Sequence, residues 1–76
     1  MWEKYKDTNK DSNVDSYLIG DDYIDVKFRN SSCIYEYTYK LSGKYNVEIM
    51  KKLAREGNGL NSYILKNCKE LFINKK

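Results

Sequence analysis

The sequence predicts an α+β domain in which a three-stranded antiparallel meander is followed by two helices packed on one sheet face, in the order β-β-β-α-α. Between residues 14 and 39 apolar and polar side chains alternate, which is the two-residue period of half-buried strands. From residue 47 onward the apolar spacing changes to three and four residues, as in amphipathic helices. A chain of 76 residues holds one domain at most, and we place it at 12–76, after a polar, flexible lead-in at 1–11.

The strands are expected at 14–19, 23–28 and 33–39, separated by turns at 20–22 and 29–32. The second strand places Ile24, Val26 and Phe28 on one face, and Asp25 and Lys27 on the other. Antiparallel pairing through these turns starts from Phe28 opposite Cys33. It then predicts four further cross-strand pairs on the buried face, namely Val26–Tyr35, Ile24–Tyr37, Ile19–Ile24 and Tyr17–Val26.

The first helix is expected to begin at Asn46, which is a good N-cap residue, and to end at Gly57 in the left-handed conformation. Its outer side would carry a Glu48–Lys52 pair at i, i+4. A second helix follows Asn58-Gly59, continues beyond Lys66 and frays from residue 73. The apolar stripes expected on the two helices are Val47, Met50, Leu53 and Ala54, and then Leu60, Ile64, Cys68, Leu71 and Phe72.

The composition argues against catalysis. The chain has no His and no glycine-rich phosphate loop, so most general-base, nucleophile-triad and zinc chemistry is excluded. Cys33 and Cys68 fall on apolar faces, and we expect both to be unreactive and free in a reducing compartment. We therefore predict a non-enzymatic binding protein that needs no metal and no cofactor.

No apolar segment suggests a signal peptide or a membrane span, so a cytoplasmic location is expected. The formal net charge is +3 and the mean hydropathy is −0.83. The charge is uneven, with five basic against eight acidic residues in 1–39 and nine against three in 40–76. The candidate contacts to a polyanion are the tyrosines beside lysines and the cations on the outer side of the first helix, namely Tyr39, Lys40, Lys44, Tyr45, Lys51, Lys52 and Arg55.

Three segments, 12–14, 24–28 and 34–37, together resemble the KTSC domain, whose hallmark is a Tyr-x-Tyr after a Val-x-Phe strand and a polar turn. The segment 57–64 is similar to that family's Gly-x-x-Phe-Asn-x-x-Ile, although Leu60 replaces the aromatic residue. The connection at 40–46 also lacks the family's Val-Pro. The resemblance covers roughly residues 12–64 and identifies Tyr35, Tyr37, Gly57 and Asn61 as motif positions. We expect all four to be structural, with Asn61 capping the second helix rather than contacting a ligand.

The family occurs as small bacterial and phage proteins and at the C-terminus of some lysyl-tRNA synthetases, and this second setting implies RNA binding. The first hypothesis is therefore a module that binds RNA or another polyanion through its basic C-terminal surface. The alternative is a phage or mobile-element protein that inhibits a host defence complex in the manner of an anti-CRISPR protein, through Asp21, Asp22 and Asp25. The exposed edges of a three-stranded sheet would also allow a homodimer.

Overall fold

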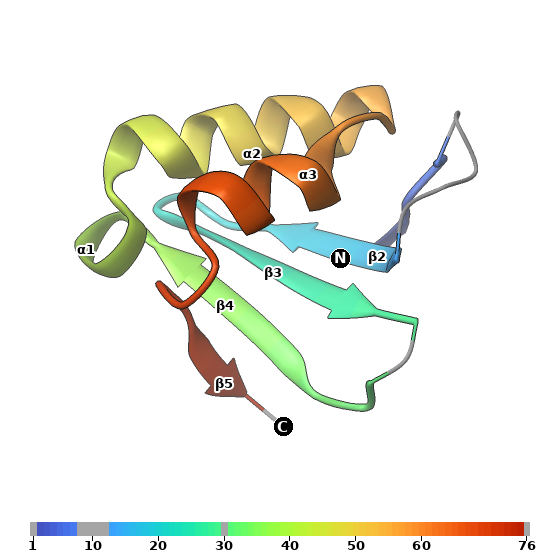
Figure 1. Ribbon diagram of the computed structural model, residues 1–76, viewed down its shortest axis with the longest axis horizontal. Coiled ribbons are helices and arrows are strands. Elements are labelled where there is room, and N and C mark those ends of the chain that lie inside the picture. Colours follow the sequence, from blue (N-terminus) through green and yellow to red (C-terminus); the bar gives the residue numbers. More distant parts are fainter. Residues whose placement is uncertain (1, 8–12, 30, 76) are drawn as a thin grey trace.

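The computed structural model describes residues 2–7, 13–29 and 31–75. Within these residues the chain forms a five-stranded antiparallel sheet, in the order β1-β2-β3-β4-β5, and three helices that lie between β4 and β5 in sequence. Two of the helices, α2 and α3, lie side by side over one face of the sheet (Figure 1). The α+β class is therefore confirmed, with a sheet that is larger than the predicted one.

The three central strands are β2 (Val14–Ile19), β3 (Tyr23–Phe28) and β4 (Ile34–Thr38), and their register is the predicted one. Ile24 lies opposite Ile19 on one side and opposite Tyr37 on the other, and Val26 likewise lies between Tyr17 and Tyr35. Because side chains alternate across a strand, this register brings the apolar set together on the face that the helices cover.

The core lies between that face and the helices. Ile24, Val26 and Tyr37 are almost fully buried there, against Val47, Met50 and Ala54 of α2 (Lys44–Glu56) and against Leu60 and Ile64 of α3 (Leu60–Asn67). Gly57 ends α2 at φ 74° and ψ 29°, so the predicted left-handed cap is confirmed.

The expected flexible lead-in is wrong for residues 3–7, whereas 8–11 lie outside the described residues. Glu3–Lys4 form β1, which pairs with β2, and the Tyr5 side chain is only 2% exposed. The Tyr5 hydroxyl accepts a hydrogen bond of 3.2 Å from Leu60 N, and Asp7 forms an ion pair of 3.1 Å with Arg29. The buried ring, the strand pairing and the ion pair together hold this short segment against the rest of the domain.

The C-terminal part also differs from the expected helix. The helix α3 ends at Asn67, and β5 (Ile73–Lys75) pairs with β4. Phe72 stacks on Tyr35, which anchors the segment between α3 and β5 to the sheet. The edges of β2 and β4, which motivated the homodimer, are thus paired within the chain itself.

The link between sheet and helices holds a short helix that the sequence did not predict, α1 (Tyr39–Ser42), capped by the Thr38 side chain at Leu41 N, 3.1 Å away. Gly43, at φ 93°, then leads directly into α2. The predicted N-cap at Asn46 is wrong, because α2 already begins at Lys44. The Asn46 side chain instead bridges two elements, donating to Ser42 O and accepting from the Tyr63 hydroxyl.

Candidate functional site

The outward side of α2 forms a shallow hollow with a basic rim. Since the helix buries Val47, Met50 and Ala54 against the sheet, the side chains half a turn away face outward. The hollow has a volume of about 490 Å³. Its lining residues, which we call the α2 surface, are Lys44, Tyr45, Glu48, Ile49 and Lys52.

Tyr45 is the most exposed large apolar side chain of the described residues, at 77%. Lys44 precedes it in the chain and Lys52 lies two turns further along the helix, and both lysines are exposed. An aromatic ring in this position adds little to folding, whereas its flat face is open to a partner. The α2 surface thus combines one exposed ring with two exposed lysines.

A compact network lies on the flank of α2 that faces the sheet. Lys51 Nζ lies 3.0 Å from Glu48 Oε2 and donates a hydrogen bond of 2.9 Å to Asp21 O. It also lies 5.4 Å from the centroid of the Tyr39 ring, and the Tyr39 hydroxyl donates to Glu48 Oε2. Lys44 Nζ approaches the same ring at 5.9 Å. The network therefore ties α1, α2 and the β2–β3 turn together.

The same contacts shift two pKa values. The hydrogen bond to the Glu48 carboxylate is the main cause that raises the pKa of Tyr39 to about 12. The pKa of Glu48 is lowered, first by the Tyr39 hydroxyl and then by the Lys51 ammonium. Glu48 is therefore an ionised carboxylate whose charge is compensated mainly by the Tyr39 hydroxyl and the Lys51 ammonium, with a smaller contribution from Lys44.

Lys51 was predicted on the outer side of α2, and this is wrong, since it is only 5% exposed. Together with Val47, Met50 and Ala54 it occupies the inward positions i, i+3, i+4 and i+7. The predicted Glu48–Lys52 pair is also replaced, because Glu48 reaches Lys51 at i+3 instead.

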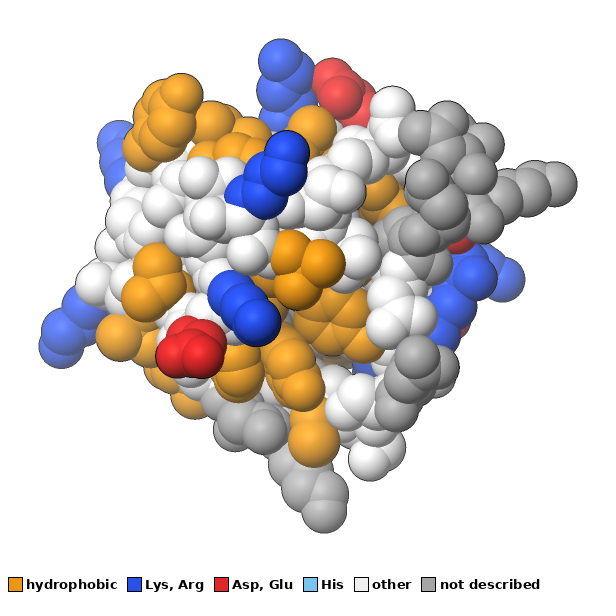
Figure 2. Space-filling model, in the orientation of Figure 1, with side chains coloured by type: hydrophobic (Ala, Val, Ile, Leu, Met, Phe, Trp, Pro, Cys, Tyr) orange, Lys and Arg blue, Asp and Glu red, His pale blue; other side chains and the backbone are white. Residues whose placement is uncertain are grey.

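The remaining predicted contacts do not form one surface. Lys40 is exposed on α1, Tyr39 is half-buried in the network, and Arg55 lines a separate hollow with Glu3, Tyr17 and Ile19. On the face drawn in Figure 2 the lysines and arginines stand singly, with hydrophobic side chains between them. Of the seven candidates, the structure brings Lys44, Tyr45 and Lys52 together.

The acidic candidates are also divided. Asp21 and Asp22 are exposed in the β2–β3 turn, but Asp25 is only 4% exposed and is not available to a partner. It lies on β3, the central strand, between its cross-strand neighbours Leu18 and Glu36. The strands on both sides of β3 explain the burial of Asp25. The alternation of side chains along β3 only placed Asp25 on the face away from the helices and did not predict that it is buried.

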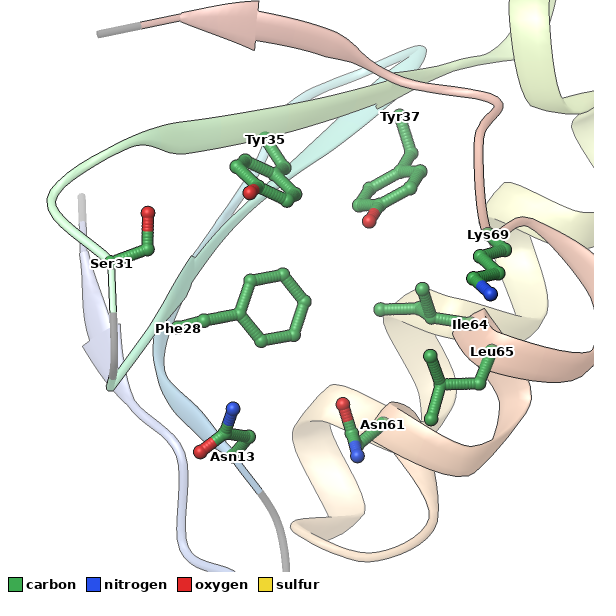
Figure 3. A pocket seen from close by; sticks show the side chains of 9 residues that line it. All are labelled: Asn13, Phe28, Ser31, Tyr35, Tyr37, Asn61, Ile64, Leu65 and Lys69. Carbon is green, nitrogen blue, oxygen red and sulfur yellow. The ribbon is translucent and has the colours of Figure 1, made fainter.

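A pocket of about 290 Å³ lies between α3 and the part of the β3–β4 sheet that the helices leave uncovered. The rings of Phe28, Tyr35 and Tyr37 point into it from the sheet, and Asn61 and Leu65 face them from α3 (Figure 3). Its other lining residues are Asn13, Ser31, Ile64 and Lys69. On the surface, hydrophobic side chains are visible between α3 and these strands (Figure 2).

Sequence reasoning did not predict this pocket. Tyr35, Tyr37 and Asn61 were assigned structural roles, and Asn61 is not the expected cap, because α3 is preceded by Gly59 and has no side-chain cap bond. The pocket depends on the length of α3. Because this helix ends at Asn67, Leu65 in its last turn and Lys69 just after it both line the pocket. One feature of the sequence did indicate such a pocket. Apolar and aromatic side chains continue along the strands as far as Phe28, and two helices of the expected length would not cover the sheet that far.

The cysteines are free; Cys33 is half-buried and Cys68 is buried, where burial raises the pKa of its thiol. In the part of the chain that the structure describes, no three His, Cys, Asp or Glu side chains gather in a way that could hold a metal ion. None of the described helices has both the length and the apolar character needed to cross a membrane.

Comparison of the chain with protein-family models, with curated proteins and with solved structures gives no match. The resemblance to the KTSC domain therefore stays a prediction.

Proposed function

We propose that this chain is a non-catalytic binding module that holds single-stranded RNA, or another polyanion, on the α2 surface. The observation that carries the proposal is the 77% exposed ring of Tyr45, which shares one hollow with the exposed amines of Lys44 and Lys52. A base stacked on an aromatic side chain contributes about 1–3 kcal/mol and needs no particular sequence. The two lysines lie where they would meet the phosphates on either side of such a base.

The compensated charge of Glu48 supports the same proposal. An unpaired carboxylate in the hollow would repel a phosphate, but this one is held by Tyr39 and Lys51. The exposed amine of Lys40, on the neighbouring α1, would extend the path of a longer strand. Contacts of this kind give salt-dependent affinity with little sequence preference.

The test is fluorescence anisotropy of a labelled, mixed-sequence single-stranded RNA, titrated with the protein at several salt concentrations. For single strands the logarithm of the affinity falls by about 0.7 per phosphate contact for each unit of log salt. The double variant Lys44→Glu/Lys52→Glu should therefore lose binding and flatten the salt dependence. Tyr45→Ser should weaken binding by about 5- to 150-fold, from the loss of one stacked base.

The matched control is Lys4→Glu/Lys66→Glu, which makes the same change in net charge at exposed positions outside the α2 surface. Equal losses in the two double variants would show that only total charge matters and would overturn the proposed site. Failure of the unaltered protein to bind RNA at low salt would overturn the proposal itself. The phage-interactor alternative would then depend on Asp21 and Asp22, with Asp25 excluded by its burial.

A further inference from the structure

We infer that the pocket between α3 and the β3–β4 strands binds a small planar aromatic molecule that carries an anionic group, such as an aryl carboxylate. The ring would lie against Phe28 and Tyr35, and the anion would reach the Tyr37 hydroxyl and the Lys69 ammonium. This site is separate from the α2 surface and shares none of its residues.

The Tyr37 hydroxyl is the first observation. Its residue is only 1% exposed, yet the hydroxyl points into the pocket, and none of the described residues forms a hydrogen bond with it (Figure 3). Other tyrosine hydroxyls of the chain are matched: that of Tyr5 accepts from Leu60 N, and that of Tyr63 donates to Asn46 Oδ1 at 2.6 Å. Because the hydroxyl opens into the pocket and is not bonded to any described residue, it can donate a hydrogen bond to an anionic ligand there without giving up a bond to one of them.

The aromatic walls are the second observation. Tyr35 stacks on Phe72 with centroids 4.4 Å apart and an interplanar angle of 6°, and Phe28 meets it edge to face at 5.3 Å. Tyr37 also contacts Phe72 edge to face, at 5.9 Å. These contacts fix the rings in place before any ligand arrives. Flat, preorganised walls favour a flat ligand, because little side-chain freedom is lost on binding.

The charge of the lining is the third observation. Among the described residues that line the pocket, Lys69 is the only charged one, and the other polar groups are hydroxyls and amides, which can donate to an anion. Burial raises the pKa of Tyr37, so its hydroxyl keeps the proton that it would donate at neutral pH. A volume of about 290 Å³ lies at the lower end of the range of ligand pockets, which suits one or two rings with a short substituent.

The experiment is a heteronuclear NMR titration of the labelled full chain with three probes: benzoate, cyclohexanecarboxylate and benzyl alcohol. Benzoate should shift the amide signals of pocket residues saturably, at millimolar concentration or below. Cyclohexanecarboxylate keeps the charge without the flat ring, and benzyl alcohol keeps the ring without the charge, so each should bind at least about fivefold more weakly. Equal affinity for all three probes, or no saturable shift with benzoate, would overturn the inference.

Two variants assign the polar contacts. Lys69→Gln and Tyr37→Phe should each weaken benzoate binding by about three- to tenfold, whereas the control Lys66→Gln, on the exposed side of α3, should leave it unchanged. Because none of the described residues bonds the Tyr37 hydroxyl, Tyr37→Phe should leave the stability of the ligand-free protein nearly unchanged. A destabilised Tyr37→Phe, or benzoate affinity that neither variant changes, would contradict the proposed contacts.

A third variant protects the test against subtle folding effects. Leu65 is 55% exposed at the rim, so Leu65→Trp should fill the pocket from outside and abolish benzoate binding while the fold is kept. The site is also separable from the RNA proposal. Lys44→Glu/Lys52→Glu should still bind benzoate, and Leu65→Trp should still bind RNA, so either site can fail without the other.

Discussion

Lys51 and Lys52 are neighbours in sequence and identical in chemistry, but they face different surroundings around α2. The amine of Lys51 is buried and contacts Glu48, the Asp21 carbonyl and the ring of Tyr39. Lys52 is exposed and lines the α2 surface beside Tyr45. A rotation of about 100° per residue separates a structural cation from a free one. Helical phase, rather than residue type, therefore decides which charges of a basic segment can bind a partner.

The largest expected effect compares two adjacent apolar residues of α2, one on its buried side and one on its exposed side. Met50 is fully buried under α2, whereas Ile49 lines the exposed hollow. Met50→Ala should lower the free energy of unfolding by about 2–5 kcal/mol, since it leaves a cavity in a thin core. Ile49→Ala should cost less than about 1 kcal/mol. Urea denaturation of both variants measures the difference, and equal losses would contradict the orientation of α2.

The C-terminal end of α2 offers a second contrast, between two glycines that both have positive φ. A Cβ at Gly57 would lie 2.5 Å from Lys6 Cβ, whereas the nearest atom to a Cβ at Gly59 is 3.9 Å away. Gly59→Ala should therefore lower the free energy of unfolding by only about 1 kcal/mol, which is the cost of placing an alanine in the left-handed conformation. Gly57→Ala adds a clash and should cost about 2 kcal/mol or more. If Gly59→Ala proved the more harmful in thermal unfolding, the packing of the N-terminal segment on α2 would be wrong.

A third, smaller effect compares the two lysines directly. Lys51→Met keeps the apolar stem but removes the partners of Glu48 and of the Asp21 carbonyl, and it should cost about 1–2 kcal/mol in the free energy of unfolding. Lys52→Met removes no protein contact of this kind and should stay within about 0.5 kcal/mol. For RNA binding the order should reverse, with Lys52→Met the weaker binder. Parallel effects of the two variants in both assays would contradict the division of α2 into two sides.

The sequence predicted the centre of the sheet better than its borders. The pairs Ile24–Tyr37 and Val26–Tyr35 followed from alternation and from two short turns, because a slip of one residue would expose the whole apolar set. The strands β1 and β5 have two and three residues, too few to show any period, and they are held by backbone pairing and by single aromatic anchors such as Tyr5.

The candidate sites show the same division. Tyr45, Lys44 and Lys52 could be predicted because they lie opposite a regular apolar stripe. Lys51 was misplaced since its charge was given more weight than its spacing from Val47 and Ala54, and long lysine stems can be buried when the amine finds partners. The pocket at Tyr37 could not be predicted, because it depends on the length of α3 and on the pairing of β5 with β4.

The smallest expected effect lies in the pH dependence of the Tyr39–Glu48–Lys51 network. Because the folded-state pKa of Glu48 is below its unfolded value of about 4.3, its contribution to stability is present above that pH and is lost as the pH falls through the folded pKa. Glu48→Gln should therefore be less stable than the unaltered chain at pH 7, and this difference should shrink by pH 3. Urea denaturation midpoints at the two pH values measure it.

At alkaline pH the network should lose stability as the pH rises, because the pKa of Tyr39 is raised rather than lowered. The pKa of Tyr39 is raised to about 12 in the folded state, so its contribution is complete below about pH 10 and is lost between pH 10 and 12. Tyr39→Phe removes the shared hydrogen bond, which is the first cause of both shifts, and should weaken the acid and the alkaline dependence together. If Glu48→Gln changed stability by the same amount at pH 3 as at pH 7, the carboxylate would not be held by this network. The charge of Glu48 would then be free to repel a phosphate on the α2 surface.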